Sequence, residues 1–453
     1  MKTLIKNIHT LATFDKNGTE LKDAWVSIED NIIKGIGSGN TPTDPFDKVI
    51  DAKDMLVLPG FVNTHHHFYQ SLFRAVPEVQ DAKLFDWLTF LYEKWKYIDE
   101  EAVKVSTVIA ILEMMKSGVT TTTDHLYLFP NGHPTLYDSE VEGAKLTDVR
   151  FYGTRGSMSL SKKDGGLPPD SVVQTVDEIL KDYERVVNLY HDPKPYSMSR
   201  VALAPCSPFS VTKDLMVLTR EFAEKHDLLI HTHLAETKDE EQFCVEQFGR
   251  RPVDYMEDLG WLSDRAWFAH VVHVSDEDIK KLSDSKSGMA HCPSSNMRLG
   301  SGVAPVYKMK NTNMRIGLGV DGSSSNDTGN FLLEIRNAML LQRVAFGESA
   351  LTAREALKLA TIGGASVLRM DEEIGSIEVG KAADIIGFNL QDRLEFAGGL
   401  SDPVAAIVFC DAKQVDFSMI NGSVVIEDGR FVSIDEAEFI QKQNSISKKL
   451  LEW

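Results

Sequence analysis

Short runs of apolar residues, bounded by polar turns, occupy both ends of the chain. These strand-like runs cover residues 4–8, 24–29, 32–36, 55–58, 384–389, 405–409, 414–420 and 423–427. The dipeptide Asn421-Gly422 between the last two runs is typical of a two-residue hairpin turn. We therefore expect residues 1–58 and 372–430 to form one small discontinuous β-sandwich domain, although two unrelated β-extensions would give the same pattern.

Strand-like runs alternate with helical patterns through the middle of the chain, which is typical of βαβ units. Eight runs are candidate strands: 60–67, 118–125, 150–157, 200–207, 228–236, 266–272, 288–295 and 315–322. Helical patterns occur at 101–117, 171–190, 213–226, 276–282 and 330–344. This order predicts an α/β fold, a (β/α)₈ TIM-like barrel over residues 59–371, followed by a C-terminal helix at 431–453. A doubly wound sheet is the second interpretation, but no GxGxxG turn follows the first strand.

The net charge and the cysteine content of the chain indicate which kinds of partner and which cellular compartment to expect. The 453 residues include 48 Lys and Arg against 67 Asp and Glu, a formal net charge of −19. A surface this acidic repels phosphate backbones and anionic lipids, so we expect neither nucleic acid nor a membrane as partner. The N-terminus lacks the apolar stretch of a secretory signal. Four scattered cysteines without CxxC spacing suit the reducing cytoplasm, where we expect the protein to act on a small molecule.

Histidines gather at the C-terminal ends of the predicted barrel strands, where barrel enzymes build their active sites. His65 and His67 end the first strand and, being two residues apart, share one face of it. His233 ends the fifth strand, His270 the sixth and Asp321 the eighth. Any one of these histidines alone is more often a hydrogen-bonded core residue, but the whole group would be costly to bury without a metal ion. The group predicts a Zn²⁺ site with a position left for water.

Several assignments around this group stay open. His231 shares a strand face with His233 and is a competing ligand, although it lies deeper in the strand. Glu236 is placed to carry protons beside a metal ion, or is an acid favoured by a helix N-terminus. The fourth predicted strand, 200–207, has no Lys or Glu that could bridge two metal ions, so we expect one ion per subunit. Its Cys206 is expected to be a packing residue.

Residues in the loops after the strands are expected to select the substrate. Trp87 and Phe209 would stack on a flat heterocycle, and Gln70 and Arg155 would hydrogen-bond its carbonyl groups. The other predicted lining residues are His125 and Ser207. Each has a structural alternative: the apolar run that contains Trp87 is also the pattern of a helix core, and Arg155 is a candidate partner for an acidic residue of the barrel.

Several of these segments together resemble the amidohydrolase superfamily, and within it the cytosine/guanine deaminase-like group. The segments are PGFVNTHHH at 59–67, HLAE at 233–236, AH at 269–270, VDG at 320–322 and GSIEVGKAAD at 375–384. A second set is similar to 8-oxoguanine deaminases, which convert 8-oxoguanine to urate and ammonia. It comprises HFYQSL at 67–72, FDWL at 85–88, DGGLPPD at 164–170, APCSPFS at 204–210 and SNMRL at 295–299. The chain departs from this set at 293–295, where Pro-Ser-Ser stands in place of an expected second cysteine.

The resemblance implies a role for each candidate residue. The ligands of one metal ion, Zn²⁺ with Fe²⁺ as the other candidate, would be His65, His67, His233 and Asp321. His270 would hydrogen-bond the water on the metal, Glu236 would be the proton shuttle, and Asp321 would share in taking the proton of the water. Gln70 would contact a ring carbonyl. The resemblance also implies a homo-oligomer, most simply a dimer.

Three functions follow as hypotheses. The first is a zinc-dependent deaminase of an oxidised purine, 8-oxoguanine, or of a related ring such as isoxanthopterin, guanine or a hydroxytriazine. The second is a cyclic-amide hydrolase of the imidazolonepropionase type, which opens a ring and releases no ammonia. The third is a non-catalytic paralogue that binds a nucleobase or a protein, which would need neither Glu236 nor His270.

Overall fold

The computed structural model describes residues 1–43 and 45–452, and its centre is a closed barrel of eight parallel strands. The strands follow one another around the barrel in chain order. They are β6 (Phe61–Asn63), β7 (Val119–Leu126), β8 (Arg150–Ser157), β9 (Ser199–Pro205), β10 (Ile230–Leu234), β11 (Ala266–His270), β12 (Gly288–His291) and β13 (Arg315–Leu318). The predicted (β/α)₈ barrel is confirmed.

Several barrel strands end earlier than the sequence predicted, and β6 and β12 do so for a local reason. Strand β6 ends at Asn63, because the chain then turns toward the 3₁₀ helix η1 (Phe68–Phe73). Strand β12 ends at His291, because Pro293 has no N–H to donate to a neighbouring strand and instead begins helix α9 (Pro293–Arg298). The side chains that follow both strands therefore lie at the mouth of the barrel.

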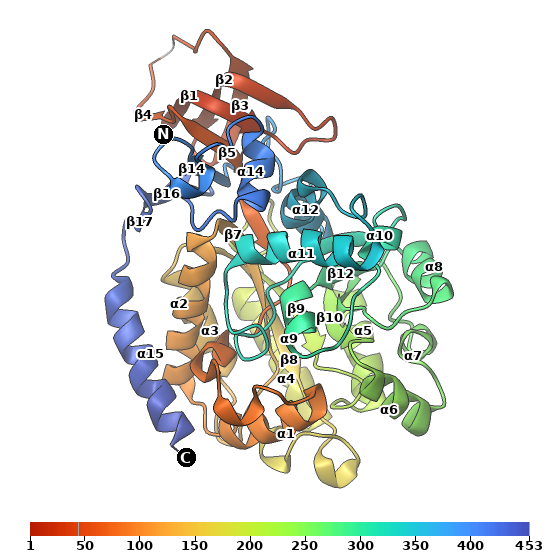
Figure 1. Ribbon diagram of the computed structural model, residues 1–453. Helices are drawn as coiled ribbons and strands as arrows, with labels where there is room; N and C mark the ends of the chain where they lie inside the picture. The colour runs from red at the N-terminus through yellow and green to blue at the C-terminus, as the bar shows by residue number, and fades with distance from the viewer. Residues whose placement is uncertain (44, 453) are drawn as a thin grey trace.

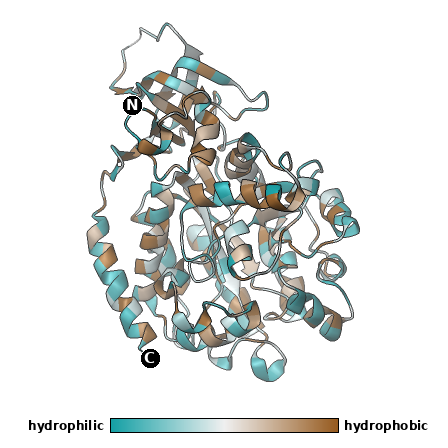
Figure 2. Cartoon of the chain, viewed as in Figure 1, coloured by the Kyte–Doolittle hydropathy of each residue, from teal (hydrophilic) through white to brown (hydrophobic). Residues whose placement is uncertain are grey.

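Helices form the outer layer, and in Figure 2 they carry hydrophobic and hydrophilic residues side by side. They are α1 (Leu84–Trp95), α2 (Glu100–Lys116), α3 (Leu136–Lys145), α4 (Val176–Tyr190), α5 (Lys213–His226), α6 (Lys238–Phe248), α7 (Pro252–Asp258), α8 (Asp276–Asp284), α9, α10 (Val306–Met309), α11 (Phe331–Phe346), α12 (Ala353–Lys358) and α13 (Gly364–Val367). The helix predicted from residue 171 begins at Val176, because Thr175 and Glu178 form a capping box there. Helix α4 then buries Ile179, Tyr183 and Val186, one stripe of its surface.

A second sheet combines both ends of the described chain in nine strands. They are β1 (Lys2–Ala12), β2 (Glu20–Glu29), β3 (Ile32–Ser38), β4 (Lys48–Asp51), β5 (Met55–Pro59), β14 (Ile385–Asn389), β15 (Phe417–Ile420), β16 (Ser423–Glu427) and β17 (Arg430–Phe431). Strand β5 lies between β1, to which it is parallel, and β14, to which it is antiparallel. The predicted pairing of the two terminal segments is confirmed, as one mixed hydrogen-bonded sheet that lies beside the barrel (Figure 1).

The strand predicted for residues 405–409 is wrong, because these residues belong to helix α14 (Pro403–Phe409). Asp402 caps this helix by accepting the N–H of Ala405 at 3.1 Å, and Pro403 occupies its first position. A short apolar run fits a buried helix as well as a buried strand. The capping residues just before the run decide between the two.

A buried ion pair joins the barrel to the terminal sheet. The guanidinium of Arg150, on β8, donates to both carboxylate oxygens of Asp384, at 3.1 and 3.2 Å. Asp384 directly precedes β14, and it also accepts the N–H of Asn421 at 2.7 Å. Both side chains of the pair are almost fully buried, so each charge depends on the other.

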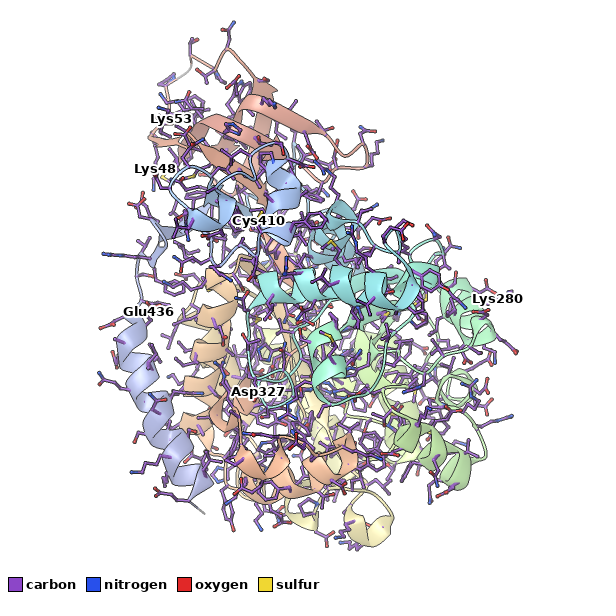
Figure 3. The ribbon with its side chains drawn as sticks, viewed as in Figure 1. Lys48, Lys53, Lys280, Asp327, Cys410 and Glu436 are labelled. Carbon is purple, nitrogen blue, oxygen red and sulfur yellow. The ribbon has the colours of Figure 1, made fainter. Side chains whose placement is uncertain are left out.

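The C-terminal helix α15 (Glu436–Leu451) packs along the outside of α2 (Figure 1). Near its start Glu436, labelled in Figure 3, forms an ion pair with Lys116 at 3.3 Å. Further along, Gln443 donates to the Ser71 hydroxyl at 3.0 Å. Residue 453, which the predicted helix included, lies outside the described residues.

The composition of the helices and the state of the cysteines complete the description of the fold. None of the helices in the described part of the chain has the length and apolar content needed to cross a membrane. Cys206, Cys244 and Cys292 are buried free thiols, and Cys410, just after α14 (Figure 3), is a partly exposed one.

Candidate metal centre and substrate pocket

Four buried donor groups meet at the C-terminal end of the barrel. The Nε2 atoms of His65 and His67 lie 3.2 and 3.3 Å from Asp321 Oδ1, and His67 Nε2 lies 3.1 Å from His233 Nε2. A tetrahedral zinc ion with bonds of about 2.0–2.1 Å needs donor atoms about 3.3 Å apart. His65 Nε2 is buried and has no hydrogen-bond partner among the described residues. The four groups therefore fit a metal ion.

The second nitrogen of two of these rings is bound to the backbone. His67 Nδ1 donates to the carbonyl oxygen of His125 at 2.8 Å, and His233 Nδ1 donates to that of Cys206 at 2.6 Å. A neutral imidazole that donates from Nδ1 has its lone pair on Nε2. These lone pairs are therefore available to a metal ion. His231, the competing candidate, is bound elsewhere: its Nε2 lies 2.8 Å from His65 Nδ1.

Burial and neighbouring charges set the protonation of the donor group. Burial lowers the pKa of His65 well below its usual 6.5 and that of His233 to about 3, so both rings are neutral near pH 7. Burial alone would raise the pKa of Asp321, but the adjacent side chains of His65, His67 and His270 outweigh it and hold that pKa well below 3.8. Neutral imidazoles and an ionised carboxylate are the forms that bind metal ions.

Glu236 and His270 face each other beside the donor group. Glu236 Oε2 lies 3.6 Å from His270 Nε2, and His270 Nδ1 lies 2.9 Å from Asn296 Oδ1. Burial raises the pKa of Glu236 above its usual 4.5. Burial would lower the pKa of His270, but the negative charges of Glu236 and Asp321 raise it instead. Both shifts favour the protonated form, so this pair of side chains can hold a proton beside the donor group.

The turns after the strands hold these side chains in an uncommon backbone conformation. Ala235, His270 and Asp321 have φ values of 53°, 73° and 61°, in the left-handed region that residues other than glycine seldom adopt. The buried carboxylate of Glu240 accepts the N–H groups of Ala235 and Glu236, both at 2.8 Å. These hydrogen bonds offset the cost of the left-handed turn and fix the direction of Glu236.

A pocket opens beside the donor group. Its lining combines polar groups with apolar and aromatic surface, as small-molecule sites do. The lining residues are His67, Gln70, Leu84, Trp87, Leu88, Tyr127, Cys206, Phe209, His233, Glu236, His270, Leu299, Asp321 and Ser325. Of the six predicted substrate contacts, Gln70, Trp87 and Phe209 are therefore in the pocket wall.

The amide of Gln70 is free to bind a ligand. Its Oε1 atom is buried and has no hydrogen-bond partner among the described residues. Gly322 makes room for it, because a Cβ atom at that position would lie 1.9 Å from Gln70 Oε1. A glycine next to Asp321 therefore lets the amide reach the pocket.

The structure does not place the other three predicted contacts in the wall that the described residues form. Arg155 is not among the lining residues, and its Nε donates to Asp182 at 2.6 Å, so Asp182 is the acidic partner that the sequence analysis gave as the alternative. His125 donates from Nε2 to the carbonyl of Ala204 at 2.8 Å and stacks on His233. The Ser207 hydroxyl bonds that of Ser210 at 2.7 Å. Each of these side chains binds a protein group, although His125 Nδ1 is buried without a hydrogen-bond partner among the described residues.

Sequence reasoning missed several residues around Asp321 and the pocket. The hydroxyls of Ser295 and Ser325 lie 2.6 and 3.1 Å from Asp321 Oδ2, to which they donate. Cys206, expected only to pack, lines the pocket. The signal for Ser295 is Pro293, which begins α9 and turns the following residues toward the strand ends. Ser325 belongs to a polar run, 321–325, that has no helix or strand pattern of its own.

The loops that carry these serines are held together by Glu334, a buried acid of α11. Its carboxylate accepts the N–H of Ser294 at 3.0 Å and a hydrogen bond from Asn326 at 3.3 Å. Beside them, Asp327 accepts the N–H of Ala75 at 2.6 Å (Figure 3). Burial raises the pKa of Glu334 from 4.5 to about 8.

Glu334 should make the protein less stable as the pH rises. The folded chain holds the Glu334 proton up to about pH 8 and the unfolded chain releases it near 4.5, so unfolding becomes easier between these pH values. In urea unfolding at pH 6 and pH 8.5, we expect Glu334→Gln to gain about 2–3 kcal/mol relative to wild type at the higher pH. A difference between variant and wild type that is the same at both pH values would contradict this assignment.

The chain belongs to the amidohydrolase family, whose model matches residues 56–425. It is 43% identical over 450 residues to the 8-oxoguanine deaminase of Pseudomonas aeruginosa, covering 99% of both chains. It is 33% identical over 466 residues to the hydroxydechloroatrazine ethylaminohydrolase of Pseudomonas sp. (strain ADP), covering 99% of this chain and 96% of the relative.

A solved structure shares the whole architecture. The atrazine chlorohydrolase of Arthrobacter aurescens TC1, complexed with zinc, matches 99% of this chain and 100% of its own, with a TM-score of 0.92 and 30% identity. The family and the deaminase relative together identify the protein as a hydrolytic enzyme that acts on C–N bonds.

Proposed function

We propose that the protein is a zinc-dependent aminohydrolase that converts 8-oxoguanine and water to urate and ammonia. The observation that carries the reaction class is a pocket in which Glu236 and His270 face a four-donor group of three imidazoles and one carboxylate. The choice of ring rests on the 43% identity to an 8-oxoguanine deaminase over nearly the whole chain. Isoxanthopterin, guanine and a hydroxytriazine are the alternative rings.

The donor group supports one metal ion per chain. His65, His67, His233 and Asp321 would hold it, and zinc is our assignment because the likeness extends to a relative that was solved with zinc. Fe²⁺ is the other ion that such an imidazole-rich set accepts. When bound, the ion supplies a Lewis acid that makes a water molecule nucleophilic near neutral pH.

The proton transfers fall to residues of the chain. Asp321 and His270 accept the proton of the attacking water. Neutral Glu236, with its pKa raised by burial, donates a proton to the ring nitrogen beside the amine-bearing carbon, which makes that carbon electrophilic. The water oxygen then forms the new C–O bond. Asp321 and His270 return their proton to the amine, which leaves as ammonia when the C–N bond breaks, and Glu236 recovers the proton of the new hydroxyl as it becomes a carbonyl. The Ser301 hydroxyl, 3.3 Å from Glu236 Oε1, holds the carboxyl in place.

The pocket wall supports a flat substrate with polar edges. The rings of Trp87 and Phe209 offer stacking surface, and the Trp87 N–H is already bound to the Ser324 carbonyl at 3.2 Å. The free amide of Gln70 offers an acceptor for a ring N–H and a donor for a ring carbonyl.

A panel of rings tests the proposed reaction and the choice of substrate. We expect the zinc-loaded enzyme to release ammonia from 8-oxoguanine with a kcat/KM at least about tenfold above guanine, isoxanthopterin, cytosine and a hydroxytriazine, a difference of about 1.4 kcal/mol in transition-state binding. Ammonia from another ring alone would refute the substrate and keep the reaction. No ammonia from any ring would favour the cyclic-amide hydrolase, because ring opening releases none.

We also propose a cytoplasmic homo-oligomer, most simply a dimer. The buried free thiols Cys206, Cys244 and Cys292 suit a reducing compartment. Helix α11 exposes the apolar side chains of Leu340, Val344 and Phe346, which a second subunit would cover.

A further inference from the structure

His231 and His233 share one face of β10, but the structure gives them different neighbours. His233 Nε2 lies 3.1 Å from His67 Nε2, within the donor group. His231 Nε2 lies 2.8 Å from His65 Nδ1, on the side of the His65 ring opposite to Asp321. His231 is therefore one ring removed from the metal position and touches only one of its candidate ligands by a hydrogen bond.

The hydrogen bonds of His231 fix which atoms carry protons. Its Nδ1 lies 2.8 Å from the carbonyl oxygen of Trp267, and a carbonyl can only accept, so His231 Nδ1 carries a proton. In the neutral ring Nε2 is then an acceptor, and the hydrogen between the two rings belongs to His65 Nδ1. This leaves the lone pair of His65 on Nε2, the atom that faces Asp321 Oδ1 at 3.2 Å.

The charged alternative for His231 is unfavourable here. An imidazolium would donate from Nε2 to His65 Nδ1 and move the His65 proton to Nε2, where it would repel a cation. Neither hydrogen-bond partner of His231, a carbonyl and an imidazole, carries a negative charge that would offset burial of the charged ring.

Trp267 holds the His231 ring in this orientation. The two rings stack with centroids 4.3 Å apart and an angle of 15° between their planes. The indole N–H of Trp267 donates to the carbonyl of Thr64 at 3.0 Å, and Thr64 directly precedes His65. One buried tryptophan therefore fixes both the backbone before His65 and the ring that bonds its side chain.

We infer that His231, held by Trp267, is a positioning residue that sets the tautomer and the direction of His65 as a metal ligand. His231 acts on the ion only through His65. The inference rests on the metal site of the proposed function, but it makes no assumption about the substrate. Outer partners of histidine ligands commonly contribute in this way to metal affinity.

Two substitutions of His231 distinguish the effect of its hydrogen bond to His65 from the effect of its packing. His231→Leu fills the site without an acceptor, whereas His231→Gln keeps an amide oxygen that can accept from His65 Nδ1. His291→Leu is the matched control, because His291 is a buried histidine at the end of β12 that has no hydrogen-bond partner among the described residues. Metal-free forms of all variants are compared by circular dichroism and thermal unfolding, so that a variant that fails to fold is recognised.

The readout is zinc affinity, measured by competition with a chromophoric chelator. We expect His231→Leu to raise the zinc Kd about 10–100-fold and to change the absorption bands of the cobalt-substituted protein, while His231→Gln and His291→Leu stay within about threefold of wild type. His231→Leu with wild-type affinity and an unchanged cobalt spectrum would overturn the inference. Equal weakening by Leu and Gln would also overturn it. Because ammonia is not the readout, a protein that releases none would refute the proposed reaction and leave this inference standing.

Discussion

Glu236→Gln is expected to lower kcat by about 10²–10⁴-fold while the zinc content stays at the wild-type level. Glutamine has nearly the same shape as glutamate, but it cannot donate and recover a proton. Its amide still fits beside His270 and Ser301, which lie 3.6 and 3.3 Å from the carboxylate oxygens. The loss should therefore appear in turnover with little change in metal binding.

Steady-state ammonia release and metal analysis of the same preparation check this prediction. Glu246→Gln is a suitable control, because Glu246 is an exposed acid of α6, the helix that follows Glu236, and is not among the pocket-lining residues. The control should keep wild-type kcat. If Glu236→Gln turned over at a near wild-type rate with a full complement of zinc, Glu236 would not be the proton carrier.

Asp384→Ala is expected to cost about 3–5 kcal/mol of the free energy of unfolding. The substitution leaves the guanidinium of Arg150 buried with its charge unpaired. It also removes the acceptor of the Asn421 N–H. Arg150 keeps only neutral partners such as the carbonyls of Tyr196 and Ser197, at 2.7 and 2.8 Å, which do not neutralise its charge.

Urea unfolding compares this loss with that of an exposed pair. Lys280, labelled in Figure 3, and Asp284 form an ion pair on the surface of α8, and both side chains are mostly exposed. Asp284→Ala should change stability by at most about 0.5 kcal/mol. An Asp384→Ala loss no larger than this would show that the buried pair does not hold the terminal sheet to the barrel.

The elements of the barrel could be predicted because local patterns and long-range packing agree. The run 150–157 and the helix 213–226 have the same bounds in the structure as in the sequence prediction. Prediction failed at 405–409, where apolar residues alone do not separate helix from strand. It also missed β4, a four-residue strand at the sheet edge with little apolar pattern.

The sequence predicts one part of the site, namely which types of residue stand at the ends of the barrel strands. The convergence of His65, His67, His233 and Asp321 follows from their places at the ends of barrel strands. The sequence also placed His231 deeper in its strand than His233, but alternation gives only the face of a strand, so the bond between His231 and His65 Nδ1 could not be predicted. Arg155 could not be resolved either, since its partner Asp182 comes from a different element, α4.

The interleaving of strands from both ends of the chain has a consequence for its synthesis. One edge of β5 pairs with β1, but the other pairs with β14, at residues 385–389, beyond the entire barrel. At about 5–20 residues per second, a ribosome needs on the order of tens of seconds to add the intervening chain. During that time β5 presents unpaired N–H and C=O groups of the kind that recruit strands of other molecules. The terminal sheet can therefore be completed only after translation has passed residue 389.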